Sequence, residues 1–186
     1  MTFKNTTTEF GLISKSLHWG VILIFLAQFF LAGTMKELPN DGAALGMSKW
    51  ALHDLHKSLG VLVLLLGIFR IYWRVSGVLP EWKQALSTLE ARLVGFTEWG
   101  LLSLMIAMPA TGYLMSNAGG FPVKFFGLFT LPAVIGKSKA AGELFHELHG
   151  ICAMLVMVIV ALHLGLILKR TLVNKDRFIF RMISKQ

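Results

Sequence analysis

Two histidines in the last apolar segment of the chain have a spacing that suits metal ligation inside a membrane. His149 and His163 lie fourteen residues apart within the apolar stretch 148–168. Fourteen residues of α-helix turn a side chain to within about 40° of its starting direction and move it about 21 Å along the axis. A membrane-spanning helix would therefore carry one imidazole near each surface, both on the same face. Because ionisable residues at membrane depth are rare and usually functional, this pair predicts a functional site.

Two more histidines, at the start of other apolar segments, supply partners at both depths. If the chain crosses the membrane four times, His18 lies with His163 on the side of the termini (the inner side), and His56 lies with His149 on the outer side. Facing imidazoles inside a helical bundle are typical axial ligands of haem iron. We therefore expect His18 and His163 to bind an inner haem, and His56 and His149 an outer haem. A single buried histidine is more often an ordinary hydrogen-bonded residue, but four at two depths favour ligation.

The cysteine content restricts the type of haem. Cys152 is the only cysteine, and the chain has no C-x-x-C-H motif. Covalent attachment of a c-type haem requires that motif. We therefore expect heme b, two per chain, held by axial ligands and packing.

Four apolar segments can position these histidines. Of the 186 residues, 55% are hydrophobic and 15% charged, a balance that soluble domains of this length rarely show. A helix needs about 20 apolar residues to cross a bilayer. The sequence therefore predicts an all-α fold in which residues 1–186 form a single domain, an integral membrane four-helix bundle with two b-type haems in its core. The predicted spans lie near residues 16–35, 50–74, 92–116 and 143–169.

The distribution of positive charge predicts the orientation. The net charge is +8, and twelve of the 18 lysines and arginines fall on the inner side, including all six arginines. By the positive-inside rule both termini are cytoplasmic, in a multi-pass protein of the bacterial inner membrane. The basicity therefore reflects insertion in a lipid bilayer, and nucleic acid is not expected as a partner. The inner set is Lys4, Lys15, Arg70, Arg74, Lys83, Arg92, Lys169, Arg170, Lys175, Arg177, Arg181 and Lys185, and the outer set is Lys36, Lys49, Lys57, Lys124, Lys137 and Lys139.

The two remaining histidines, His53 and His146, each precede a proposed outer ligand by three residues. Three interpretations stay open. They are interfacial polar residues in contact with water, or they form an outer metal site with Asp54 and Glu147, or they help to capture or protonate a small anion beside the outer haem, assisted by Lys57.

Other residues inside the spans have two interpretations each. Gly60 and Gly67 share one face of the second span, where they would admit a flat macrocycle or allow close helix packing. Glu98 is an acidic residue inside the third span, where it would pair with Arg92 or another cytoplasmic base, or relay protons to a quinone. The apolar run 125–135 is too short to span and is expected to dip back towards the membrane.

The motifs around the histidines resemble those of the bacterial cytochrome b561 family, over nearly the full chain. The register of the histidines is the specific part of the resemblance. The similar segments are S-x-H-W at 16–19, L-H-K-S-L-G at 55–60, the segment 105–116 with its P-x-T-G-Y-L-M-S, L-H-G at 148–150, A-L-H at 161–163, and the ending 175–182.

The resemblance implies a four-helix dihaem cytochrome of the membrane that exchanges electrons with quinone. Some members of the family look to be superoxide oxidases, which take an electron from superoxide outside and deliver it to ubiquinone. The family's ligands fall on His18, His56, His149 and His163. Many members have histidine where this chain has Glu98 and Arg170.

Three classes of function remain as hypotheses. In the first, superoxide or a periplasmic redox partner reduces the outer haem, the inner haem follows, and ubiquinone accepts the electron, with Lys57 steering the anionic donor. In the second, the chain is a non-catalytic electron-transfer anchor between quinone and a separate redox protein. In the third, a haem-free transporter or metal-handling protein uses the histidines as an ion path.

Overall fold

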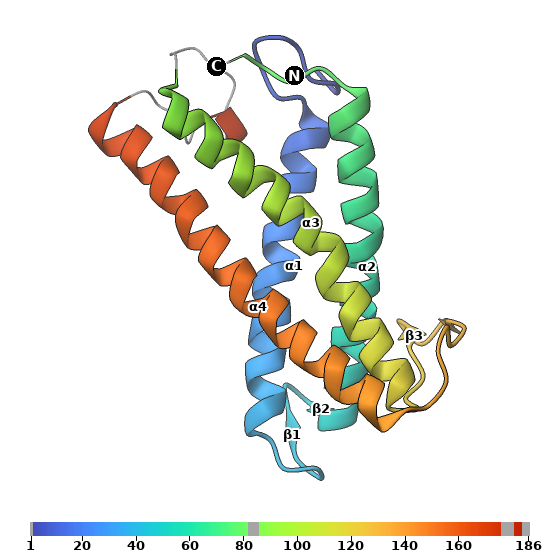
Figure 1. The fold of residues 1–186 in the computed structure, drawn as a ribbon. Coiled ribbons are helices and arrows are strands. Elements are labelled where there is room, and N and C mark those ends of the chain that lie inside the picture. The colour runs from blue at the N-terminus through green and yellow to red at the C-terminus, as the bar shows by residue number, and fades with distance from the viewer. Residues whose placement is uncertain (1, 82–85, 176–180, 184–186) are drawn as a thin grey trace.

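Four long helices lie side by side and make up most of the chain. The computed structural model describes residues 2–81, 86–175 and 181–183, and Figure 1 shows the arrangement of the helices. The inner residues Lys83, Arg177 and Lys185 of the charge analysis lie outside the described residues. The helices are α1 (Leu12–Glu37), α2 (Lys49–Ser76), α3 (Thr88–Ala118) and α4 (Lys139–Leu168), and α4 continues into the π-helical turn η1 (Lys169–Val173).

Each helix is long and apolar enough to cross a membrane. The predicted ranges 16–35, 50–74 and 92–116 lie within α1, α2 and α3, and the range 143–169 ends at the first residue of η1. Three helices begin at a serine whose side chain accepts a hydrogen bond from the first turn, a standard N-cap. These serines are Ser48, Ser87 and Ser138.

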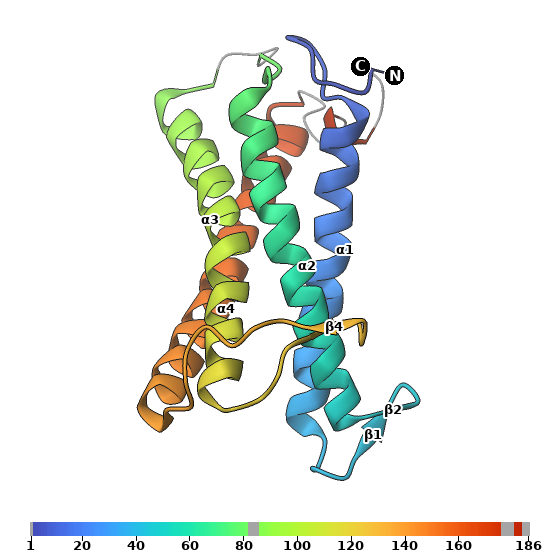
Figure 2. The same cartoon turned by 90° about the vertical axis from the view of Figure 1, so that its right-hand side faces the viewer.

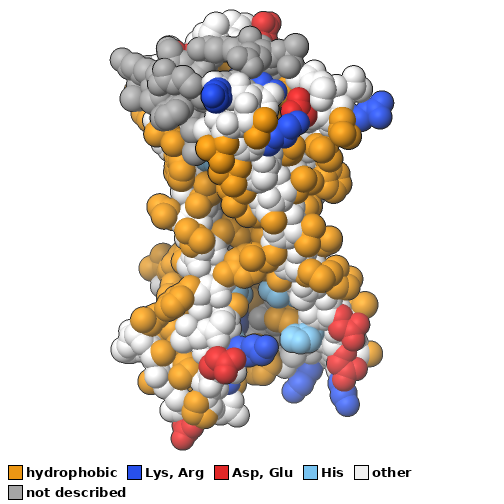
Figure 3. Space-filling model, turned by 90° about the vertical axis from the view of Figure 1, so that its left-hand side faces the viewer, with side chains coloured by type: hydrophobic (Ala, Val, Ile, Leu, Met, Phe, Trp, Pro, Cys, Tyr) orange, Lys and Arg blue, Asp and Glu red, His pale blue; other side chains and the backbone are white. Residues whose placement is uncertain are grey.

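Consecutive helices pack against one another, α1 on α2, α2 on α3 and α3 on α4. A shared core joins α1 to α3 and α4, where Phe25 and Phe29 pack against Leu104, Val156 and Ile159. Many of the other large apolar side chains are exposed. In Figure 3 they form a band between two charged ends, as expected where lipid covers the surface. Histidine side chains are visible in a hollow near the outer end.

Two short hairpins lie on the outer side. β1 (Ala43–Ala44) and β2 (Met47–Ser48) form an antiparallel pair at the ends of α1 and α2. β3 (Lys124–Phe125) and β4 (Phe129–Thr130) form a second antiparallel pair, whose turn places Phe126 and Gly127 at positive φ. Figure 2 shows this outer loop lying across α2. The dip of the apolar run 125–135 towards the membrane stays a prediction.

Candidate functional site

The two outer histidines face each other across the bundle. His56 of α2 and His149 of α4 have ring centres 6.4 Å apart, with their planes at 76°. Two metal–imidazole bonds of about 2 Å each, plus roughly 1 Å from each nitrogen to its ring centre, require about 6 Å between ring centres. The separation therefore suits one metal atom between the two rings.

The surroundings of His149 prepare it to be a ligand. Its Nδ1 lies 2.9 Å from the backbone carbonyl of Met108 and 3.3 Å from the hydroxyl of Thr111. A carbonyl oxygen only accepts, so Nδ1 carries the proton and Nε2 keeps its lone pair for a metal. Histidine ligands commonly donate their second N–H in this way. A β-carbon on Gly112 would lie 3.0 Å from Cε1 of His149, so the glycine makes room for the ring.

A mostly apolar cavity surrounds the outer pair. Its wall includes Phe25, Gln28, Gly60, Met108 and Val123. Two buried polar atoms at this cavity, Nδ1 of His56 and Oε1 of Gln28, have no hydrogen-bond partner among the described residues. Such atoms are unusual in folded proteins and are expected where a further group completes the site. An apolar cavity between two imidazoles fits the donor set and the flat ring of a b-type haem.

The two glycines of α2 differ in what they do. A β-carbon on Gly60 would make only an ordinary contact with Gln28, at 3.6 Å, so this position leaves space at the cavity. A β-carbon on Gly67 would lie 3.0 Å from Ile106 and 3.3 Å from the carbonyl oxygen of Met105. This carbonyl also lacks its usual helical hydrogen bond, because Pro109, four residues later in α3, has no N–H. Gly67 therefore serves close packing of α2 on α3, and Gly60 leaves room for a ligand.

The two inner histidines are arranged differently. Nδ1 of His18 lies 3.3 Å from a guanidinium nitrogen of Arg70. His163 is close enough to His18, Arg70 and Glu98 for their charges to interact, so the four side chains belong to one cluster. In the described part of the chain the rings of His18 and His163 make no direct contact, unlike those of the outer pair.

Comparison with known proteins identifies the family. The family model described as prokaryotic cytochrome b561 matches residues 9–185. The chain belongs to the prokaryotic cytochrome b561 family. It is also similar to cytochrome b561 homolog 2 of Escherichia coli (strain K12), with 32% identity over 192 residues that cover 100% of this chain and 96% of the relative. The protein is therefore a multi-pass membrane electron-transfer protein with b-type haem.

The acidic residue inside α3 of this cytochrome pairs with an arginine of α2. Glu98 lies 2.7 Å from Arg74, whose guanidinium also lies over the ring of Trp99 at 5.3 Å. The partner is thus a base on the side of the termini, in line with one of the two hypotheses, although it is Arg74 and not Arg92. Glu98 therefore offsets one of the two arginine charges near the inner histidines.

The hypothesis of a separate outer metal site is wrong for this cytochrome. His53 lies on the cavity wall and packs against Trp50, with ring centres 5.9 Å apart, while His146 is exposed on α4. Among the described residues, which include Asp54 and Glu147, no three histidine, cysteine or acidic side chains converge on a common point.

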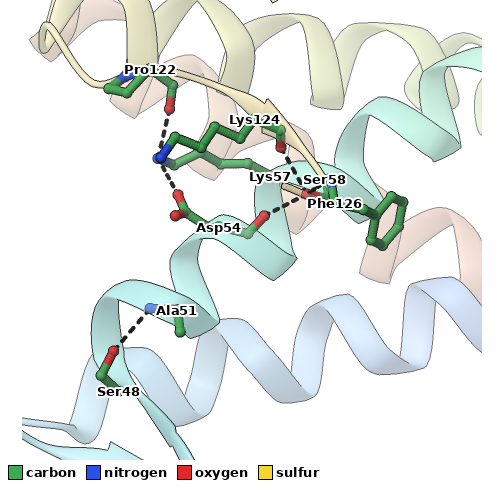
Figure 4. A network of polar contacts seen from close by, with 8 residues as sticks. All are labelled: Ser48, Ala51, Asp54, Lys57, Ser58, Pro122, Lys124 and Phe126. Atoms are coloured by element: carbon green, nitrogen blue, oxygen red, sulfur yellow. Dashed lines mark hydrogen bonds and ion pairs between the residues drawn. The ribbon is translucent and has the colours of Figure 1, made fainter. Parts of the chain in front are cut away.

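Lys57 lies at the outer cavity and is already engaged. Its ammonium group is 3.2 Å from Asp54 and 3.2 Å from the carbonyl of Pro122, and its side chain is 19% exposed (Figure 4). The adjacent Ser58 is buried and binds the same loop, donating to the carbonyl of Lys124 and accepting from the N–H of Phe126. The outer loop is thereby fastened to α2 beside the cavity.

Sequence reasoning missed three residues of these sites: Gln28, Arg70 and Gly112. Gln28 and Arg70 lie inside predicted spans, where any polar residue deserves a functional hypothesis. That signal was available for both, and Arg70 was counted only among the positive charges of the inner side. Gly112 gave no such signal, because its role depends on His149, which comes from another helix.

Proposed function

We propose that this cytochrome binds two b-type haems and conducts electrons from the outer side of the bacterial inner membrane to quinone. The outer axial ligands are His56 and His149, and the inner ones are His18 and His163. The observation that carries the proposal is the outer pair, with ring centres 6.4 Å apart across a mostly apolar cavity. An iron atom held between two imidazoles supplies reversible one-electron chemistry.

The chain's own residues orient the ligands and exclude water. The Met108 carbonyl fixes the tautomer of His149, and Gly112 leaves space for its ring. Val123, which is 2% exposed, closes one side of the outer cavity. Rigid, dry surroundings suit electron transfer because little must reorganise when the charge of the site changes.

The proposed direction of electron flow follows from the charge distribution. α1 begins and α4 ends at the same end of the bundle (Figure 1). The described arginines lie at this end, on α2, on α3 and beyond α4, so the positive-inside rule puts both termini in the cytoplasm. Electrons then enter at the pair His56–His149, nearer the periplasm, and leave at the pair His18–His163.

We propose superoxide as the donor and ubiquinone as the acceptor. Two superoxide ions each give up one electron and leave as O₂. The two electrons, with two protons, reduce one ubiquinone to ubiquinol. Lys57 is the cation that lines the outer cavity and follows a ligand directly in sequence, which suits attraction of a small anion.

One observation favours the alternative of a non-catalytic electron-transfer anchor. The ammonium group of Lys57 is already bound by Asp54 and by the Pro122 carbonyl, which reduces the positive potential available to a free anion. A protein partner would not need that steering. In this alternative a separate periplasmic redox protein docks at the outer end, and quinone exchange at the inner end is retained.

Two measurements on the purified cytochrome test the proposal. The pyridine haemochrome assay is expected to give two haems per chain with low-spin spectra, and a ratio near one would contradict the pairing of the histidines. In stopped-flow mixing, superoxide is expected to reduce the haem rapidly. Slow reduction by superoxide, with normal reduction by quinol, would favour the anchor.

A further inference from the structure

Arg70 is a charged side chain inside α2 that holds one of the inner histidines. Its Nη2 lies 3.3 Å from Nδ1 of His18. A guanidinium group has only donors, so Nδ1 of His18 must accept this hydrogen bond. In a neutral imidazole the proton then resides on Nε2.

This tautomer is the opposite of the one at the outer site. His149 donates its Nδ1 proton to the Met108 carbonyl, which leaves Nε2 free to bind a metal. For His18 to bind iron through Nε2 in the same way, its proton must move to Nδ1. Arg70 cannot donate to a protonated Nδ1, so ligation by His18 requires Arg70 to release it.

Once released, Arg70 needs another acceptor. A guanidinium inside a membrane protein is strongly destabilised unless it is hydrogen-bonded or paired with a negative charge. Glu98 is the carboxylate whose charge reaches Arg70. Glu98 already accepts a hydrogen bond from Arg74 on Oε2 at 2.7 Å, so among the described residues the charge of this carboxylate is shared between two guanidinium groups.

A b-type haem brings carboxylates of its own, the two propionates on one edge of the macrocycle. The planar fork of arginine matches a carboxylate in geometry and charge. We propose that Arg70 leaves His18 when the inner haem binds and holds one of its propionates. This inference rests on the proposed inner haem between His18 and His163. It makes Arg70 a positioning residue that also keeps a positive charge beside the inner haem.

The positive charge of Arg70 predicts a measurable effect on the midpoint potential and the retention of the inner haem, and none on the outer haem. A nearby cation stabilises the reduced form, which carries one positive charge less, so loss of Arg70 is expected to lower the inner midpoint potential. The loss of a charge-assisted hydrogen bond is also expected to speed transfer of the inner haem to a haem scavenger by about tenfold or more. The outer haem serves as the internal reference, because its proposed ligand His56 lies near the start of α2 and Arg70 lies near the other end of this helix.

The experiment compares Arg70→Gln with Arg92→Gln in the holoprotein. Arg92 is exposed at the start of α3, so this control removes the same charge at the same end of the bundle. Both variants carry haem labelled with ¹³C at the propionate carboxyls, and redox-difference infrared spectra are recorded beside potentiometric titrations. We expect the labelled carboxylate band and the inner potential to shift in Arg70→Gln and not in Arg92→Gln.

A third variant keeps the test decisive if Arg70→Gln loses the inner haem. Arg70→Lys retains the charge but not the fork, so we expect it to keep the inner haem and still shift the labelled band. An unchanged band in whichever variant retains the haem would overturn the role of Arg70. So would an equal shift in Arg92→Gln. A wild-type protein with only one haem would overturn the proposed two-haem function, and the role of Arg70 with it.

Discussion

The outer and inner pairs each consist of two histidines, but they differ in how well the surrounding residues favour binding of a metal by those histidines. At the outer end, His56 and His149 stand 6.4 Å apart between ring centres. A backbone carbonyl fixes the proton of His149, and a glycine leaves room beside its ring. These contacts come from neutral groups, which impose a tautomer without adding a competing charge.

The inner end is built from charged groups. Nδ1 of His18 contacts Arg70, and Glu98 contacts Arg74, so a guanidinium takes the place that the carbonyl of Met108 occupies at the outer end. A donor at this place selects the tautomer that does not bind iron through Nε2. The comparison teaches that the hydrogen-bond partner of a histidine's second ring nitrogen, more than the position of the histidine along the helix, decides whether the other nitrogen is free to bind a metal.

The strongest test of the comparison removes one ligand at each end. We expect His149→Ala to lose the outer haem and His163→Ala to lose the inner one, each leaving one haem per chain by pyridine haemochrome analysis. The remaining haem is expected to keep the spectrum and potential it has in the wild type. Loss of the same haem in both variants would show that the pairing by depth is wrong.

The next test disturbs the packing around His149 and leaves both outer histidines in place. In Gly112→Ala the new methyl group would lie 3.0 Å from His149, and overpacking of this kind typically costs about 1–3 kcal/mol. We expect weaker outer haem binding, by about ten- to a hundredfold, measured as transfer to a haem scavenger. Gly165→Ala on α4 is the matched control, because a β-carbon there meets nothing within 4 Å. Equal effects of the two changes would contradict a role of Gly112 at the ligand.

A third test loosens the loop that covers the outer site. Ser58 binds Asp54, Lys124 and Phe126, and Ser58→Ala removes the partner of part-buried backbone groups of Lys124 and Phe126, at a cost of about 1 kcal/mol or more. We expect faster hydrogen exchange of the outer loop and faster reaction of the outer haem with small reductants. The exposed Ser103 of α3 provides the control Ser103→Ala. If hydrogen exchange rises but the reduction rate does not, the loop does not limit access.

The smallest expected effect concerns steering of the donor. Lys57→Glu is expected to slow reduction by superoxide several-fold at low salt, with the difference fading as ions screen charges beyond about 8–10 Å. Quinol-driven reduction and the spectra are expected to stay unchanged. Lys139→Glu reverses a charge on the outer side at a side chain that is 92% exposed and outside the cavity wall. Equal rates for the two variants would leave Lys57 a purely structural role in holding Asp54 and Pro122.

The sequence by itself determined the helices, the depth of the histidines and the family. Backbone groups in lipid must be satisfied within the segment, so an apolar stretch of about 20 residues already implies a helix. The fixed rotation per residue then put His149 and His163 on one face before any contact was known. Motifs around the four histidines indicated the family that the comparison identified.

Only the tertiary structure decided which side chains meet. Glu98 pairs with Arg74 of another helix and not with Arg92 of its own. Lys57 is bound by a carbonyl 65 residues away, which no local pattern records. His53 and His146 share the spacing of the ligands but do not converge with their neighbours on a metal. Helical periodicity gives the direction of a side chain relative to its own helix, whereas partners depend on how each helix is rotated against its neighbours, and packing over the whole bundle sets that rotation.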